Sequence, residues 1–383
     1  MHQSASTGTG VAAMAQRWCL IILAALVVGA CSPLRAYESA SLLADIAAGE
    51  VSPDVERQSV SYRIDGRPGA GDLYRSKTDE PRAGLVVVPG ASPQGRDDPR
   101  VVAFAAALAD ADFAVLVPEI ENLRRLTISS ADTQVIADAL KYLEQQQGAD
   151  RPLGAVAISY AVGPATLAVH QPDLRDRVDV MVAIGGYYDS AAVATFFTTG
   201  YFNDPETQTR RYLEPNSYGK WVFVRANAGR LEEPRDQWLL AAMADRKLAD
   251  PAAPLEDLEN RLGPDGKAVA DFLNNRDPAR AADLIEALPP GVRGEMEALD
   301  LSAQELSGPG PLMVLVHGRD DSIVPYSESL ALAAAVRRPG EASRARVHLL
   351  DGLDHADLES VSLGDTFTLV QAIYDVLLVR DGG

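Results

Sequence analysis

The fold of this 383-residue chain is decided by Gly154-Ala155-Val156-Ala157-Ile158-Ser159-Tyr160-Ala161-Val162-Gly163. The first five residues are apolar, as in a buried strand, and the last ones begin an apolar helical segment that runs to His170. Ser159 therefore stands in a sharp turn between a strand and a helix. In such a turn the serine backbone is strained, and the residues two before and two after it must be small because strand and helix approach closely. Ala157 and Ala161 are small enough, although glycines are usual there, and a buried strand that ends at an incidental serine is the alternative.

Buried strands alternate with helices on both sides of this stretch. Such alternation produces a mostly parallel central sheet with helices on both faces, so the sequence predicts an α/β fold. An antiparallel hairpin is expected first, because turn residues 65–69 separate two alternating segments, 58–64 and 71–75. The other expected strands are Gly84–Val88, Phe113–Val117, Gly154–Ile158, Val178–Ile184, Leu312–Val316 and Arg346–Leu350, and the expected helices are Pro99–Ala109, Thr133–Gln147 and Thr366–Val379.

The alternation lapses between residues 186 and 311, which are rich in helical stretches. We predict that this segment is a helical cap inserted into a core of residues 58–185 and 312–383. Trp221-Val222-Phe223-Val224 has strand propensity, but the preceding Asn216-Ser217 could cap a helix, and a helix is favoured there. Further cap helices are expected over Glu233–Lys247, Asp257–Leu262 and Pro278–Ala287.

A second motif follows the strand Leu312–Val316 directly and reads His317-Gly318-Arg319-Asp320-Asp321-Ser322-Ile323-Val324-Pro325. A strand that ends in His-Gly, with an aspartate three residues after the glycine and Val-Pro beyond it, resembles the acid-bearing loop of α/β-hydrolases. The resemblance extends in layout from about Ser59 to Leu378, and it implies that Asp321 is the catalytic acid. Asp320 is the alternative, or both are loop-capping carboxylates.

A serine nucleophile needs a base, and the chain has five histidines from which to supply it. His2 lies in the amino-terminal segment, His170 ends a helix, His317 belongs to the acid loop and His348 lies inside a strand. His355 remains, just past the last strand. The order Ser159, Asp321, His355 is also the order of the catalytic triad along α/β-hydrolase chains.

The resemblance implies an oxyanion hole as well. One donor would be the backbone N–H of Tyr160, and the other that of Ala91 in the loop Val88-Pro89-Gly90-Ala91. An ordinary tight turn is the alternative for Pro89-Gly90.

The implied activity is that of a serine hydrolase acting on a carboxylic ester of a small acyl substrate. The layout is closer to the esterase and dienelactone-hydrolase-like branches than to lipases with a His-Gly-Gly-Gly loop. A thioesterase, amidase or peptidase, or a binding protein without catalysis, would have the same fold. Six aromatic residues line the acyl pocket or form the cap core, and core is favoured because apolar residues bury by default: Tyr187, Tyr188, Phe196, Phe197, Tyr201 and Phe202.

The composition argues against several other functions. The net charge is −19 and no basic run reaches five residues, which excludes a nucleic-acid-binding surface. No pair of histidines has metal-ligand spacing, the acidic loops lack the alternation of a calcium site, and no Gly-rich turn leads into a Lys-Ser or Lys-Thr helix start. We therefore expect no metal and no cofactor.

The amino terminus has the layout of an export signal. Arg17 precedes an apolar run that is too short to span a bilayer, and Val28-Gly29-Ala30-Cys31 resembles a bacterial lipobox. The resemblance implies a lipoprotein signal peptide over residues 1–30, lipid on Cys31, and a protein anchored in the cell envelope, at the outer membrane or periplasmic face in a diderm host. An ordinary cleavable signal is the alternative. Residues 31–57 are expected to be a tether with a short helical stretch over Ala40–Ala48. The two cysteines, Cys19 and Cys31, both lie in the amino-terminal segment, so the mature body can hold no internal disulfide.

Overall fold

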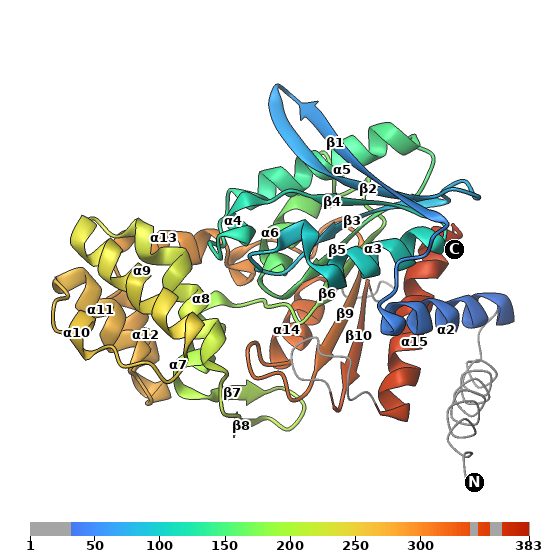
Figure 1. Ribbon diagram of the computed structural model, residues 1–383. Coiled ribbons are helices and arrows are strands. Elements are labelled where there is room, and N and C mark those ends of the chain that lie inside the picture. The colour runs from blue at the N-terminus through green and yellow to red at the C-terminus, as the bar shows by residue number, and fades with distance from the viewer. Residues whose placement is uncertain (1–31, 338–343, 353–361, 383) are drawn as a thin grey trace, which may run out of the picture.

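The computed structural model describes residues 32–337, 344–352 and 362–382. Its centre is an eight-stranded sheet in the order β1-β2-β4-β3-β5-β6-β9-β10 (Figure 1). The pairs β1–β2 and β2–β4 are antiparallel, and every later pair is parallel. The predicted α/β fold with a mostly parallel sheet is confirmed. The strands are β1 (Val55–Ile64), β2 (Arg67–Ser76), β3 (Ala83–Val88), β4 (Phe113–Pro118), β5 (Leu153–Ile158), β6 (Val180–Ile184), β9 (Leu312–Gly318) and β10 (Ala345–Leu350).

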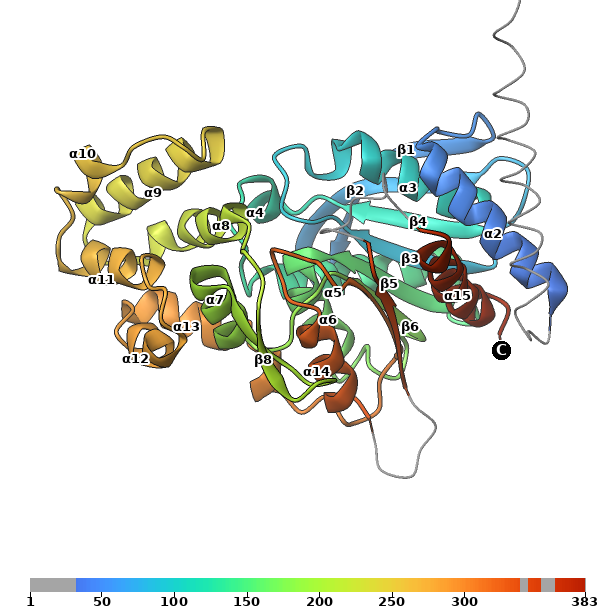
Figure 2. The same ribbon diagram turned by 90° about the horizontal axis from the view of Figure 1, so that it is seen from below.

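Helices cover both faces of the sheet (Figures 1 and 2). The helices α5 (Asp132–Gln147), α6 (Val162–Val169) and α14 (Ser327–Ala335) bury one face, and α3 (Pro99–Asp110) and α15 (Leu363–Arg380) bury the other. A short helix, α4 (Glu121–Arg124), follows β4.

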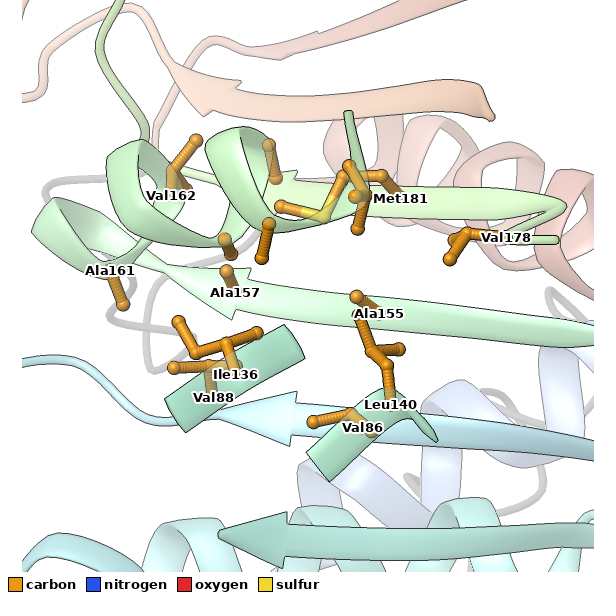
Figure 3. Packing of buried hydrophobic residues seen from close by; sticks show 14 of the residues in the cluster. Val86, Val88, Ile136, Leu140, Ala155, Ala157, Ala161, Val162, Val178 and Met181 are labelled. Atoms are coloured by element: carbon orange, nitrogen blue, oxygen red, sulfur yellow. The ribbon is translucent and has the colours of Figure 1, made fainter. Parts of the chain in front are cut away.

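Strand β5 shows how the two faces share its residues. Ala155 and Ala157 lie against Ile136 and Leu140 of α5 (Figure 3), whereas Val156 belongs to the core on the opposite face. Side chains alternate between the faces of a strand, so a strand covered on both sides is apolar throughout. This is why β5 was recognisable as an unbroken apolar run.

The segment expected to be a tether with a short helical stretch over Ala40–Ala48 forms a longer helix that packs on the core. Helix α2 (Pro33–Ala48) begins at a capping serine, Ser32, and buries Ala36, Ala40 and Leu42. The guanidinium Nε of Arg35 lies 2.9 Å from the Asp381 carboxylate, which ties α2 to the end of α15. Residues 1–31, with the predicted signal peptide and Cys31, lie outside the described residues. Among the helices of the described part of the chain, none has the length and apolar character needed to cross a membrane.

The insertion between β6 and β9 forms the predicted helical cap, which lies at one end of the core (Figures 1 and 2). The stretch containing Trp221 is helical, as predicted, and the Asn216 side chain caps it by accepting the Tyr218 N–H at 2.9 Å. A two-stranded hairpin in the cap was not predicted. The cap elements are α7 (Ser190–Thr199), β7 (Tyr201–Asp204), β8 (Thr209–Tyr212), α8 (Ser217–Asn227), α9 (Pro234–Ala249), α10 (Glu256–Glu259), α11 (Pro264–Leu273), α12 (Ala281–Glu286) and α13 (Pro290–Ala298).

Candidate active site

Ser159 lies at the end of β5, in the turn that leads through a short 3₁₀ helix (Ser159–Ala161) into α6. Its φ angle is +58°. A non-glycine residue rarely adopts this left-handed conformation, which brings a strand and a helix together at a sharp angle. The strained turn predicted from the sequence is therefore present, with Ala157 and Ala161 fully buried on either side of the serine.

The strain at Ser159 gives a prediction about stability. We expect Ser159→Gly to be more stable than Ser159→Ala by about 1 kcal/mol, because glycine adopts a positive φ without the penalty that a Cβ brings. Urea unfolding of the two proteins measures the difference. The same pair at Ser61, an exposed residue of β1, should show the opposite order, since glycine weakens a strand. Equal stabilities of the two Ser159 variants would mean that the backbone there is relaxed.

The loop after β3 lies against this turn. A Cβ placed on Gly90 would lie 3.6 Å from the Ile158 carbonyl oxygen and 3.8 Å from the Ser159 Cβ. The next residue, Ala91, has its carbonyl oxygen bound by the Tyr218 hydroxyl at 3.1 Å. The structure thus brings both predicted sources of oxyanion-hole N–H groups, Tyr160 and the loop carrying Ala91, next to Ser159.

The two neighbouring aspartates of the acid loop, Asp320 and Asp321, have very different environments. Asp321 is 1% exposed, and one of its carboxylate oxygens accepts the backbone N–H groups of Ile323 at 2.8 Å and Val324 at 2.9 Å. Asp320 is exposed. A buried, hydrogen-bonded carboxylate has one fixed orientation, so Asp321 has the environment that an orienting acid needs.

His317 lies beside Asp321, and both nitrogens of its imidazole ring already have partners within the protein. Its Nδ1 lies 2.7 Å from the Ser329 hydroxyl, and its Nε2 lies 2.9 Å from the Val324 carbonyl and 3.3 Å from the second Asp321 oxygen. Both ring nitrogens are thus engaged within the core. His317 supports the acid loop and is not placed to act as a base.

The other described histidines are engaged elsewhere. His170 contacts the Thr166 carbonyl at 2.8 Å, and His348 lies 3.0 Å from Asp375 of α15. The predicted base, His355, lies outside the described residues. The chain leaves β10 at Leu350, whose carbonyl accepts the Arg319 N–H at 2.8 Å, so the segment that leads to His355 starts beside the acid loop.

Of the three comparisons with known proteins, only the one with solved structures finds matches, and these concern the fold. No protein-family model matches the sequence. No curated protein matches it either. Among solved structures, a candidate hydrolase from Legionella pneumophila matches 90% of this chain and 95% of its own length with a TM-score of 0.55, at 13% identity. This chain has the α/β-hydrolase fold. The rice cell-wall-degrading esterase LipA from Xanthomonas oryzae matches 88% of this chain and 93% of its own, with a TM-score of 0.48 and 14% identity.

Between the α/β-hydrolase core and the cap lies a cavity of about 70 Å³. Tyr160, the residue after Ser159, forms part of its wall, and burial raises the pKa of its hydroxyl. Tyr187 is also in the wall and donates its hydroxyl to the Leu299 carbonyl at 3.1 Å. The complete lining is Ile128, Tyr160, Tyr187, Ser190, Val193, Ala194, Phe197, Phe223, Ala226, Asn227, Glu295, Met296 and Leu299.

Four of the six aromatic residues that the sequence assigned to the acyl pocket or the cap core are buried in hydrophobic clusters. Tyr187 and Phe197 line the cavity and also belong to the core of the cap. Phe196 and Phe202 instead pack with Tyr326 in a separate cluster. The sequence did not point to Asn227 or Glu295, because neither residue belongs to a recognisable motif.

Helix α8 joins the parts of the candidate site. A Cβ on Gly219 would lie 3.0 Å from the Tyr160 hydroxyl and 3.2 Å from Ile323 of the acid loop. The neighbouring Tyr218 contacts Ala91, as described above. The cap is thereby in contact with the serine turn, the acid loop and the loop after β3. In the described part of the chain no three His, Cys, Asp or Glu side chains are grouped so that they could hold a metal ion.

A buried carboxylate links the acid loop to the start of the cap. Glu328, on the first turn of α14, accepts the backbone N–H groups of Tyr188 at 3.0 Å and Asp189 at 2.8 Å. Burial, together with the charges of Asp189 and Asp300, raises its pKa to about 7 despite these two hydrogen bonds. The ionised form is therefore less favourable in the folded protein than in the unfolded chain.

This raised pKa predicts a pH-dependent stability. Between the ordinary pKa of 4.5 and about 7, folding stability should fall as pH rises, because the unfolded chain loses the proton first. Glu328→Gln keeps an oxygen acceptor without the charge, so we expect it to raise the free energy of unfolding at pH 8 by up to about 3 kcal/mol, and by much less at pH 4.5. Thermal unfolding at both pH values measures this effect. Glu256→Gln, on the exposed surface of α10, should show no such pH dependence. A stabilisation of equal size at both pH values would contradict the assignment.

Proposed function

We propose that this protein is a serine hydrolase that cleaves a carboxylic ester of a small acyl substrate. The observation that carries the proposal is the strained Ser159 turn, which lies against the Gly90-Ala91 loop and beside an apolar cavity. A nucleophilic hydroxyl, two backbone donors and a pocket for the acyl chain are the parts that acyl transfer requires.

In the proposed mechanism the Ser159 hydroxyl attacks the ester carbonyl while His355 takes its proton. The N–H groups of Tyr160 and Ala91 stabilise the negative charge on the carbonyl oxygen. His355 then returns the proton to the leaving alcohol as the C–O bond breaks, and water releases the acyl group in a second, similar step. Asp321 orients the imidazole and stabilises its protonated form.

Labelling of the purified full chain with a fluorophosphonate probe, followed by a panel of ester, thioester, amide and peptide substrates, tests this proposal. Labelling together with preferential ester turnover is the expected result. Labelling with preferential thioester, amide or peptide turnover would keep the serine hydrolase and change its substrate class. Absence of both labelling and turnover would overturn the proposal in favour of a binding protein with the hydrolase fold.

A further inference from the structure

The Ala91 N–H, which the proposed mechanism uses as an oxyanion donor, belongs to the loop of residues 89–98 between β3 and α3. Within the part of the chain that the structure describes, no group accepts a hydrogen bond from this N–H. The preceding Gly90 lies against the serine turn, since a Cβ placed on it would lie 3.8 Å from the Ser159 Cβ. The donor is therefore near the nucleophile and is not used by the resting protein.

The backbone of the loop does not by itself fix the direction of this N–H. Glycine is the most permissive residue, so Gly90 allows the Gly90–Ala91 peptide to rotate. The loop is held to the core further along, where the Arg96 guanidinium lies 2.8 Å from the buried Asp72 carboxylate. An oxyanion donor must lie about 2.7–3.1 Å from its target, and a misplacement of about 1 Å can cost about 10²-fold in rate. A contact at Ala91 itself would therefore matter for catalysis.

The cap supplies such a contact. The hydroxyl of Tyr218, 127 residues later in the chain, donates to the Ala91 carbonyl at 3.1 Å. Burial raises the pKa of this hydroxyl, so it keeps its proton near neutral pH and remains a donor. Because the carbonyl and the N–H of Ala91 belong to one residue, a hydrogen bond that holds the first also restricts the second.

Tyr218 is a firm support because its turn of α8 is attached to the acid loop, where the cap meets the core (Figures 1 and 2). The Asn216 N–H donates to the Ser322 carbonyl at 2.8 Å, and the Asn216 side chain accepts the Tyr218 N–H. Gly219 packs so closely that a Cβ there would lie 3.2 Å from Ile323. The same helical turn thus contacts the acid loop and the loop of residues 89–98.

We propose that Tyr218 is a positioning residue, whose hydroxyl holds the loop of residues 89–98 so that the Ala91 N–H faces the oxygen that becomes negatively charged. The inference rests on the proposed esterase function and adds a residue of the cap to that site. Tyr218 acts through Ala91 and does not touch the substrate. A complete oxyanion hole then depends on the cap being seated on the core.

The first test is Tyr218→Phe, which removes the hydroxyl and keeps the ring. Loss of an oxyanion donor lowers kcat by about 10²–10³-fold, and a donor that is only misdirected should cost less. We expect kcat for ethyl butyrate to fall about tenfold, with KM changed by less than about twofold, because the donor acts on the charge of the transition state. Initial rates over a range of ester concentrations measure both constants.

A second tyrosine of the cap provides the matched control. The Tyr212 hydroxyl donates to Glu214 on the exposed strand β8, so Tyr212→Phe also removes one hydrogen-bonded hydroxyl. We expect this variant to keep the kcat and KM of the unaltered chain. Circular dichroism and thermal unfolding of both variants establish that they are folded.

A transition-state analogue provides a readout that a general loosening of the cap would not produce. When 1,1,1-trifluoro-2-pentanone binds, Ser159 Oγ adds to its carbonyl carbon, the hydroxyl proton passes to the base, and the former carbonyl oxygen carries the negative charge. Its inhibition constant should rise about tenfold in Tyr218→Phe, in parallel with the fall in kcat. The inhibition constant of butyramide, whose carbonyl stays neutral, should change by less than about twofold.

The outcomes separate this inference from the proposed function. If the unaltered chain hydrolyses esters and Tyr218→Phe has the same kcat and the same affinity for the ketone, the positioning role is wrong and the esterase stands. A rise in KM that accounts for the whole loss, or an equal loss of butyramide binding, would also overturn it, because Tyr218 would then shape the substrate pocket. An unaltered chain with neither labelling nor turnover would overturn the esterase, and the positioning role with it.

Discussion

The Ser159→Ala protein should lose all fluorophosphonate labelling and at least about 10⁴-fold of its kcat/KM toward esters. The hydroxyl oxygen is the atom that forms the bond to the acyl carbon, and alanine has no atom to replace it. The fold should survive the change, since Ser159 is small and its neighbours Ala157 and Ala161 are unaffected. Labelling gels and initial rates measure the two effects, and thermal unfolding reports the fold.

A matched serine serves as the control for this experiment. Ser61→Ala makes the same change on the exposed face of β1, and we expect it to retain full labelling and turnover. If Ser159→Ala labelled as strongly as the unaltered chain, the nucleophile would have to be another residue. The proposed mechanism would then be wrong, although the fold would stand.

Asp321→Asn should lower kcat by about 10³–10⁴-fold, the loss seen when the acid of a serine protease triad becomes an amide. The Asn oxygen can still accept the N–H groups of Ile323 and Val324, so the loop keeps its shape. The amide cannot stabilise a protonated imidazole. It also places an N–H group near His317 Nε2, which lies 3.3 Å from the second Asp321 oxygen, so we expect a lower melting temperature as well.

The adjacent carboxylate makes this experiment decisive. Asp320→Asn changes the same functional group one residue away, on an exposed side chain, and should alter kcat by less than about twofold because a surface charge contributes little. The opposite result, a large loss for Asp320→Asn and a small one for Asp321→Asn, would assign the acid to Asp320. Equal losses in both variants would indicate that the loop matters only for structure.

The sequence predicted the core well because its strands are buried on both faces and therefore form continuous apolar runs. The helix α8 was predicted from a local signal, the Asn216 cap, against the strand propensity of the residues that follow. The hairpin of β7 and β8 had no comparable signal. Each strand has four residues, and all four residues of Thr209–Tyr212 are exposed, so no alternation of apolar and polar residues marks it.

Part of the candidate site could be predicted from the sequence and part could not. Ser159 and Asp321 belong to short motifs whose residue order reflects local backbone geometry, and the structure places both at the carboxyl ends of their strands. The cavity wall comes from segments that are distant in sequence. Glu295, for example, binds Ser130, which lies 165 residues earlier. No local pattern records such a contact, so the cavity could be found only in three dimensions.

The helix found in place of the tether determines how far the chain can be shortened. Helix α2 shields part of α3 and α15 with Ala36, Ala40 and Leu42, and its Arg35 holds Asp381 at the far end of the sequence. Proteolytic trimming up to β1 would strip this cover and leave apolar surface facing water, where exposed patches promote aggregation. Helix α2 is therefore part of the folded core, where it contacts the carboxyl-terminal helix α15.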